Sequence, residues 1–272
     1  MPVALIDGDI IAYRASSVLC PDPWNPDAPK VPLSEFWAIK TALSMVASWQ
    51  EMAECERSVV CLTGARNFRN RVLPSYKMNR VPTERPATLA AVKAALAQIP
   101  DAQLVEGLEA DDLMGIMMTN GRCPGAVCVT IDKDLRTIPG NHLNPVTTQA
   151  IEVVTEAEGN MKWLTQTLTG DKVDGYDGCP GIGPKKAETI LLGTHGVVSA
   201  AWPLVVKAFG EVSPSRLALK GLGPLTEHDA LVQARVARIL RAEDYDKNTK
   251  EVILWHPTAP VRIPVDIQER TS

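Results

Sequence analysis

The chain has 272 residues, of which 45% are hydrophobic and 22% are charged, and its formal net charge is −4. These values are ordinary for a globular protein with enough chain to bury a substantial core. The sequence has no run of about 18 apolar residues and begins with acids, so we expect no membrane span, no signal peptide and a cytoplasmic location. The cysteines fit no zinc or redox motif, and Cys61 and Cys128 fall inside apolar runs, which indicates buried free thiols.

Charge is unevenly distributed along the chain. Residues 64–93 hold one acid, Glu84, and seven basic residues: Arg66, Arg69, Arg71, Lys77, Arg80, Arg85 and Lys93. Acids instead gather in a few tight clusters elsewhere. This segregation is what a protein needs if it holds both metal ions and a polyanion.

The N-terminal part has the pattern of an α/β protein. Val3 to Ile6 is an apolar run that predicts a buried parallel strand, and Asp7 follows it. An acid at the end of such a strand faces the crevice where α/β proteins bind ligands, although Asp7 could also cap the next helix. Three elements are expected next: a proline-rich loop over 20–32, a helix over 34–56 with Ser34 as N-cap, and a second strand over 58–62 that ends at Thr63.

The basic segment also contains aromatic residues. Within residues 65–80, Phe68 and Tyr76 stand among arginines and lysines, the mixture expected where nucleic acid is held by stacking and phosphate contacts. The alternative is a solvated charged face. Residues 86–97 predict a helix with Leu89, Val92 and Leu96 on one face.

Two further acid clusters flank predicted elements. Glu109, Asp111 and Asp112 begin a Met-rich helix after a short strand signal. Capping the helix dipole needs only one or two acids, and the repulsion among three would be relieved by a divalent cation. Residues 126–131 predict the clearest strand, and Asp132 and Asp134 after it share one face if the strand continues.

A glycine turn follows the last acid pair. A helix over 160–169 leads to Asp171 and Asp174, and Gly181-Ile182-Gly183 then precedes Pro184. Proline suits the first turn of a helix, and the open amides of that turn suit a phosphate oxygen, with Lys185 and Lys186 adding positive charge. The alternative is an ordinary surface turn. More helices are expected over 186–192, over 196–210, and from a Thr226–Asp229 capping box to about Arg241, with Arg235, Arg238 and Arg241 facing solvent.

Acid clusters thus recur at four places where an apolar element begins or ends: Asp7/Asp9, Glu109/Asp111/Asp112, Asp132/Asp134 and Asp171/Asp174. Together they imply a convergent acidic pocket. Carboxylates without His or Cys suit Mg²⁺ or Mn²⁺. Two such ions about 4 Å apart can activate a water and stabilise the leaving oxygen in phosphodiester cleavage, so the expected substrate is a phosphate ester.

Five motifs carry a resemblance to a known family: LIDGDIIAYR, FRNRVLPSYKMNR, LEADDL, VTIDKDL and LTGDKVDGYDGCPGIGPKKA. In order and spacing they resemble the 5′-nuclease (flap endonuclease) superfamily, and most of all the 5′–3′ exonucleases of short-tailed bacteriophages. The resemblance covers about residues 3–192. It implies a PIN-like α/β fold, with a parallel or mixed central sheet flanked by helices, a helical arch and a helix-turn-helix DNA clamp.

The resemblance also implies a division of the chain. Residues 1–160 would form the nuclease core, including an arch segment at about 65–100. Residues 161–272 would form the helical clamp region, with the helix-turn-helix at about 168–192 and a C-terminal extension packed on the core.

The resemblance implies roles for individual residues. Asp7, Glu109 and Asp111 match ligands of a first metal ion, and Asp132, Asp134, Asp171 and Asp174 match ligands of or near a second, with Asp112 as a further helix-start acid. Lys77 and Arg80 match catalytic cations on the scissile phosphate, Tyr76 matches an aromatic that stacks on the terminal base, and Arg69 lies in the same nucleic-acid-binding segment. Gly181, Gly183, Lys185 and Lys186 match the clamp, whose turn at 178–183 tends to hold K⁺. One departure is Thr63, where many relatives carry an aspartate, and Asp9 could compensate for it.

The expected activity is that of a 5′–3′ exodeoxyribonuclease dependent on two Mg²⁺ or Mn²⁺ ions. It would act on duplex DNA, and also on flaps and RNA–DNA hybrid ends, in phage replication, recombination and primer removal in the cytoplasm of the bacterial host. One alternative is a structure-specific flap endonuclease with little exonuclease activity. The other is a PIN-like nucleic-acid-binding protein that has lost catalysis.

Overall fold

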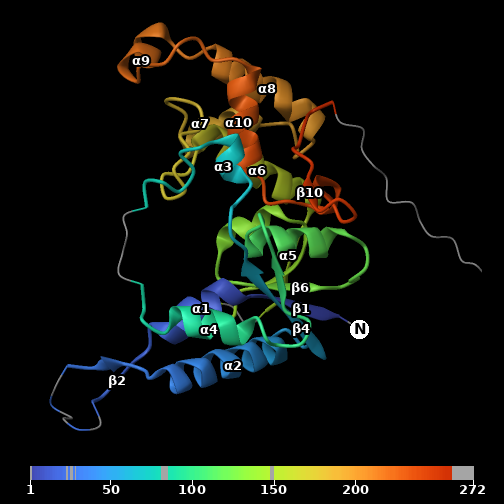
Figure 1. The fold of residues 1–272 in the computed structure, drawn as a ribbon. Helices are drawn as coiled ribbons and strands as arrows, with labels where there is room; N and C mark the ends of the chain where they lie inside the picture. The colour runs from blue at the N-terminus through green and yellow to red at the C-terminus, as the bar shows by residue number, and fades with distance from the viewer. Residues whose placement is uncertain are drawn as a thin grey trace, which may run out of the picture.

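A six-stranded sheet forms the centre of the protein, in the order β5-β4-β1-β6-β7-β8 (Figure 1). The computed structural model describes residues 2–258 except 23, 25, 26, 28, 81–84, 148 and 149. The strands are β1 (Val3–Asp7), β4 (Arg57–Thr63), β5 (Gln103–Val105), β6 (Val127–Val129), β7 (Gly140–Leu143) and β8 (Glu152–Val154). Only β8 pairs antiparallel within this sheet, with β7. The predicted α/β fold with a mixed, mostly parallel central sheet is confirmed.

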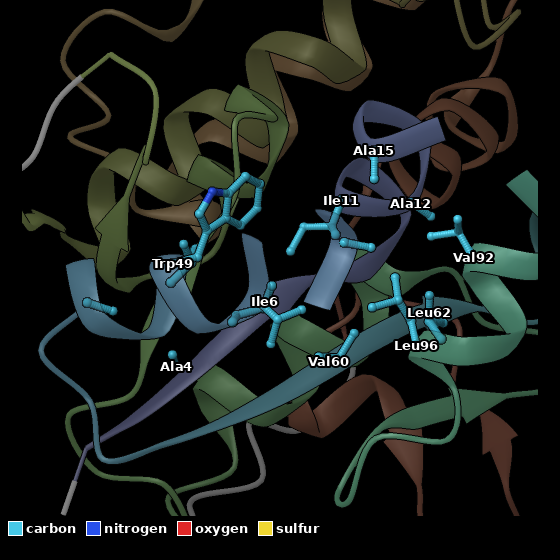
Figure 2. Packing of buried hydrophobic residues seen from close by; sticks show 14 of the residues in the cluster. Ala4, Ile6, Ile11, Ala12, Ala15, Trp49, Val60, Leu62, Val92 and Leu96 are labelled. Carbon is cyan, nitrogen blue, oxygen red and sulfur yellow. The ribbon is translucent and has the colours of Figure 1, made fainter. Parts of the chain in front are cut away.

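β1 takes the middle position because its side chains are apolar toward both faces, as helices on both sides require. All of its residues are buried. Alternate side chains point to opposite faces of a strand. Ala4 and Ile6 therefore pack in one cluster, which Figure 2 shows, and Val3 and Leu5 pack in another.

Helices cover both faces of the sheet. The face of Ala4 and Ile6 is covered by α1 (Gly8–Ser16), α2 (Glu35–Met52) and α4 (Leu89–Leu96). The opposite face is covered by α5 (Ala110–Thr119). The predicted helices over 34–56 and 86–97 are thus present but shorter, and Val92 and Leu96 are fully buried as their spacing indicated.

The rest of the chain is largely helical: α6 (Glu156–Thr169), α7 (Pro184–Leu191), α8 (Val198–Gly210), α9 (Pro214–Leu219) and α10 (Glu227–Ala237). Their buried faces form a separate core around Trp163, whose ring meets Trp255 edge-on. α10 begins at the predicted Thr226–Asp229 capping box. In Figure 1 this part lies above the sheet, with α9 at its far end.

The remaining elements are short: β2 (Leu19–Cys20), β3 (Val31–Pro32), α3 (Arg69–Val72), the 3₁₀ helices η1 (Lys133–Thr137) and η2 (Ala242–Asp244), β9 (Tyr245–Asp246) and β10 (Glu251–Val252). β2 pairs with β3 across the predicted proline-rich loop. All six cysteines are free, and Cys61 and Cys128 are buried as expected. No helix in the described ranges is long and apolar enough to cross a membrane.

The segment 65–100, predicted as a helical arch, is helical only near its ends. α3 has four residues, turns occupy 74–79, and α4 begins at Leu89. Pro74 and Pro86 oppose a continuous helix because proline lacks the amide proton that a helix interior requires. In the described part of this segment, turns thus replace the predicted continuous helix. Residues 81–84, including Glu84, lie outside the described part, and for them the arch stays a prediction.

The predicted exposure of the arginines after α10 is wrong. The helix ends at Ala237, and Arg238 and Arg241 are each 6% exposed. Arg238 Nε donates to Asp244 Oδ2 at 2.7 Å, and Arg241 Nη2 donates to Asn160 Oδ1 at 2.8 Å. These acceptors come from η2 and α6, so both arginines have polar partners inside the protein instead of water.

Candidate active site

A cavity of about 270 Å³ lies where the carboxyl ends of the strands meet the helical part. Its acids come from the start of α5, the segment after β6 and the loop after α6, and they are Glu109, Asp111, Asp132, Asp134, Asp171 and Asp174. Lys77 and Arg80 line it from the turn after α3. Asp7, at the end of β1, lies within electrostatic reach of Asp111 and Asp132. The structure therefore brings acids of three predicted clusters into one cavity and places Asp7 of the fourth cluster near them.

Asp7 caps the helix that follows it, which is one of the two roles that the sequence left open. Its Oδ1 accepts a hydrogen bond from Ile10 N at 3.1 Å, which caps α1, and its Oδ2 accepts one from Thr130 Oγ1 at 2.9 Å. Burial, together with the charges of Asp9 and Asp132, raises the pKa of Asp7 to about 7. A carboxylate kept out of water beside other acids gains most from a bound cation.

Asp111 and Asp132 share this electrostatic situation. Burial is the main cause that raises the pKa of Asp111 well above its usual range, and the charge of Asp7 adds to it. Burial also raises the pKa of Asp132. Burial and repulsion between these neighbouring carboxylates destabilise their ionised forms, whereas in an ordinary salt-bridge network each acid is paired with a cation.

Glu109 is the opposite case, because two cations hold it. Arg69 Nη1 donates to its Oε2 at 3.1 Å, and Lys77 Nζ donates to its Oε1. Burial would raise the pKa of Glu109, but the charges of Arg69 and Lys77 outweigh burial and lower the pKa to about 2. Glu109 is therefore ionised throughout the neutral pH range.

Asp132 and Asp134 reach the cavity in a different way from the one predicted. β6 ends at Val129 and η1 begins right after Asp132, so the strand does not continue as that prediction required, and the two aspartates do not share a strand face. Asp132 Oδ1 accepts from Asp134 N at 2.8 Å instead. A short side chain that bonds the backbone two residues on favours a turn over a strand, and this turn places both carboxylates in the cavity.

Asp171 and Asp174 lie in the loop after α6. Asp171 Oδ1 accepts from the amides of Val173 and Asp174, which folds the loop back on itself. Asp174 then pairs with Arg80 through Oδ1 and lies 3.7 Å from Lys77 Nζ through Oδ2.

Lys77 and Arg80 belong to the turn region after α3, within the segment that was predicted as a helical arch. Lys77 adopts a positive φ of 57°, and its amide donates to Asp174 O at 2.8 Å. This bond ties the turn to the acidic loop. Both cations are thereby fixed among the carboxylates, where a phosphate group could meet them.

Arg69 is a buried structural cation, and its predicted contact with nucleic acid is wrong. Its side chain is 3% exposed. All five of its N–H groups donate, to Glu109 Oε2, to both oxygens of Asp112, and to the carbonyls of Val236 and Arg238. No donor is left for a phosphate.

Asp112 is fully buried and is saturated by the same network. Besides Arg69, its oxygens accept from the amides of Glu109 and Leu240, both at 3.1 Å. Its predicted role as a metal ligand is therefore wrong. The extra acid at the start of α5 completes a capping box and neutralises Arg69.

Tyr76 does not present a face for base stacking, and that prediction is also wrong. Its ring is 4% exposed within the core of the helical part. Its hydroxyl lies 3.1 Å from Glu109 Oε2 and 3.1 Å from Asp174 Oδ2. Tyr76 therefore holds together one acid from α5 and one from the loop after α6.

The structure also accounts for Thr63. Thr63 Oγ1 accepts from Ala110 N at 3.0 Å, so the hydroxyl supports the first turn of α5. Asp9, which could have compensated for a missing carboxylate, lies 2.7 Å from Lys93 Nζ. These contacts give both residues structural partners next to the cavity.

The segment predicted as a helix-turn-helix at about 168–192 contains the last residues of α6, a loop and α7. Pro184 is the first residue of α7, and Gly181 has a φ of 82°, which favours glycine. The loop is fixed by bonds from Cys179 N to Leu168 O and from Gly178 N to Gln233 Oε1, both 2.8 Å. Gly181, Gly183, Lys185 and Lys186 are exposed on its outer side.

The donor chemistry of the cavity fits a hard divalent cation, because its ligands are carboxylates. As the described side chains stand, no three His, Cys, Asp or Glu groups are arranged to hold a metal ion by themselves. Three cations instead form ion pairs with the acids: Lys77 with Glu109, Arg80 with Asp174, and Lys162 with Asp134. Mg²⁺ usually takes one or two protein carboxylates and fills its other positions with water and substrate phosphate, which this arrangement allows.

Sequence reasoning missed three residues of the site. Thr130 binds Asp7, while Lys162 and Gln166 of α6 both contact Asp134. The hydroxyl of Thr130 directly before the VTIDKD acids was a usable signal. Lys162 and Gln166 carried none, because each meets its partner only through the packing of α6 against η1.

Comparison with known proteins places the chain in a family. A family model described as "5'-3' exonuclease, N-terminal resolvase-like domain" matches residues 2–164, more than half of the chain. The chain belongs to this family of 5′–3′ exonucleases. It is therefore a nuclease, that is, a hydrolase.

Relatives from phages support the same placement. The exodeoxyribonuclease of Enterobacteria phage T3 is 30% identical over 220 residues, and the exonuclease of Escherichia phage T7 is 30% identical over 223 residues. Each alignment covers 73% of both chains. The flap endonuclease of bacteriophage T5, solved with DNA and metal ions, shares the fold with a TM-score of 0.62, 14% identity, and coverage of 88% of this chain and 89% of its own.

Replacing Arg69 with methionine should destabilise the protein by about 3–5 kcal/mol, because it leaves Asp112 charged and unpaired in the interior. Urea unfolding measures the change. The control is the double variant Arg69→Met/Asp112→Leu, which removes both charges and should recover much of the loss. A single variant within about 1 kcal/mol of the parent protein would show that Arg69 is not the structural anchor.

The raised pKa of Asp7 predicts a pH-dependent stability without metal. The folded protein keeps the Asp7 proton to higher pH than the unfolded chain does, so stability falls as pH rises from about 4 to about 7, by at most about 4 kcal/mol. Asp7→Asn removes this titration. In EDTA the variant should be more stable than the parent near pH 8 and lose that advantage toward pH 5, as measured by thermal unfolding. A difference independent of pH would contradict the raised pKa.

Proposed function

We propose that this 5′–3′ exonuclease acts on duplex DNA and depends on divalent metal ions. The observation that carries the proposal is the convergence of carboxylates from α5, η1 and the loop after α6 on one cavity that Lys77 and Arg80 also line. Asp7 at the end of β1 lies within electrostatic reach of these carboxylates. Such a set of groups can hold metal ions and a phosphate together. The name exodeoxyribonuclease, given to the phage T3 relative, supports DNA as the substrate.

Two metal ions, Mg²⁺ or Mn²⁺, fit the two sides of the cavity. Asp7, Glu109 and Asp111 would hold the first, and Asp132, Asp134, Asp171 and Asp174 would hold the second. When bound, such ions supply an activated water and stabilise the leaving oxygen in phosphodiester hydrolysis. Burial, together with repulsion between neighbouring acids, raises the pKa values of Asp7, Asp111 and Asp132, and bound cations would offset both effects, which supports this assignment.

Lys77 and Arg80 would bind the phosphate that is cleaved. Each now pairs with a carboxylate of the cavity, Lys77 with Glu109 and Arg80 with Asp174. A metal ion on those carboxylates would compete for the same oxygens and leave the two cations for the substrate. Negative charge grows on the phosphate during attack, so cations fixed in place stabilise the transition state more than the ground state.

The α6–α7 turn would bind the duplex at a distance from the 5′ end that is cleaved. The exposed turn at Gly181 and Gly183 precedes the N-terminus of α7, where amides and the helix dipole favour a phosphate. Lys185 and Lys186 are exposed beside it. A K⁺ ion at the turn 178–183 would add a further positive charge next to the same phosphate.

A flap endonuclease activity on the same site is the second candidate. The shared fold with the phage T5 flap endonuclease favours it. RNA–DNA hybrid ends, and so primer removal during phage replication in the host cytoplasm, fit the same chemistry, because a metal-bound phosphate is common to all these substrates.

Cleavage of end-labelled duplexes tests the proposal. In Mg²⁺ the protein should release nucleotides from a free 5′ end and leave a duplex whose only free end is 3′ intact, and EDTA should stop the reaction. Asp132→Ala should lower the rate by at least about 10³-fold while duplex affinity stays equal or rises, since a negative charge near the phosphate is removed. A 5′-flap substrate in the same assay measures the second candidate.

Equal attack on both ends would refute the 5′ polarity. Full activity in EDTA, or near-normal turnover by the Asp132→Ala variant, would refute the metal assignment.

A further inference from the structure

Gln166 is a polar residue of the cavity that is neither one of its acids nor one of its cations. It lies on α6, and its Nε2 donates to Asp134 Oδ1 at 2.8 Å. An ionised carboxylate only accepts hydrogen bonds, so the amide nitrogen must face Asp134 and the amide oxygen must face away. The orientation of the amide is therefore fixed by chemistry.

The amide oxygen of Gln166 is buried and has no hydrogen-bond partner among the described groups. Proteins keep few such atoms, because an unpaired buried acceptor costs stability. Ser16, Thr88 and Thr137 have the other described side-chain oxygens in this condition, and the Asp9 oxygen without a hydrogen bond lies 2.7 Å from Lys93 Nζ. None of these residues lines the cavity. Gln166 thus combines a place in the lining of the cavity with an unpaired buried acceptor.

Gln166 also restricts how Asp134 can act. Lys162 Nζ lies 3.3 Å from the same Oδ1 that Gln166 binds. With two donors on Oδ1, the carboxylate is oriented with Oδ2 as its freer oxygen. One side chain therefore fixes a predicted metal ligand and presents an acceptor of its own beside it.

We propose that Gln166 is a positioning residue of the cleavage reaction: its amide nitrogen orients Asp134, and its amide oxygen accepts a hydrogen bond from a water molecule held in the cavity. The inference rests on the proposed function. Mg²⁺ and Mn²⁺ keep several of their waters in protein sites, and groups that bond to ligands or to such waters tune metal affinity. Gln166 does both from one amide.

Gln166→Met tests this, since methionine has nearly the same length but neither hydrogen-bonding group. Its affinity for Mn²⁺, measured by electron paramagnetic resonance without DNA, should fall about tenfold, and its single-turnover rate on 5′-labelled duplex should fall about tenfold. Its affinity for duplex in EDTA should not change. Its melting temperature should stay equal or rise, because the unpaired oxygen is removed along with the bond to Asp134.

Lys162→Met is the matched comparison, because it removes the other donor to Asp134 Oδ1 and keeps the amide. Its loss of Mn²⁺ affinity should stay within about threefold, as expected for a partly exposed ion pair. Equal losses in the two variants would overturn the role of the amide oxygen. A Gln166→Met protein with a lower melting temperature but unchanged Mn²⁺ affinity and rate would overturn the whole inference. Failure of the parent protein to cleave DNA would instead refute the proposed function, while the two Mn²⁺ affinities still decide this inference.

Discussion

The buried guanidinium of Arg69 is the interaction on which the site depends. A charge taken out of water is tolerated only if its donors are satisfied. Arg69 meets this condition with Glu109 and Asp112 of α5 and with the carbonyls of Val236 and Arg238 at the end of α10. It therefore joins the start of the turn that carries Lys77, the helix that carries the acids, and the helical part of the chain. Figure 1 shows α3, which begins with Arg69, between these elements.

This anchor divides the acids at the start of α5 into two kinds. Asp112 and Glu109 are neutralised within the protein, and Glu109 keeps a low pKa for that reason. Asp111 receives no such compensation and lies with Asp7 and Asp132, whose pKa values burial raises. The fixed positive charge of the site thus holds the fold together, and Asp7, Asp111 and Asp132 have no ion-pair partner among the described residues. That imbalance is the physical basis of the proposed metal dependence.

Sequence patterns predicted much of this, and their failures have a common cause. Apolar runs located β1 and β6, and the rule that parallel strands end at one edge brought Asp7 and Asp132 together. Capping and glycine-turn patterns located α10 and the α6–α7 turn. Arg69 and Tyr76 were mistaken for DNA contacts because a basic, aromatic segment has the same composition whether exposed or buried. Their burial depends on partners 33 to 169 positions away, and local sequence carries no information about those.

Manganese located in crystals of the protein tests the central claim most directly. After soaking in Mn²⁺, anomalous scattering should show two ions in the cavity, one beside Asp7, Glu109 and Asp111, and one beside Asp132, Asp134, Asp171 and Asp174. Lys77 and Arg80 should have moved off Glu109 and Asp174, while Arg69 keeps its bonds to Asp112. A cavity without manganese, at a concentration that supports cleavage in solution, would contradict the account.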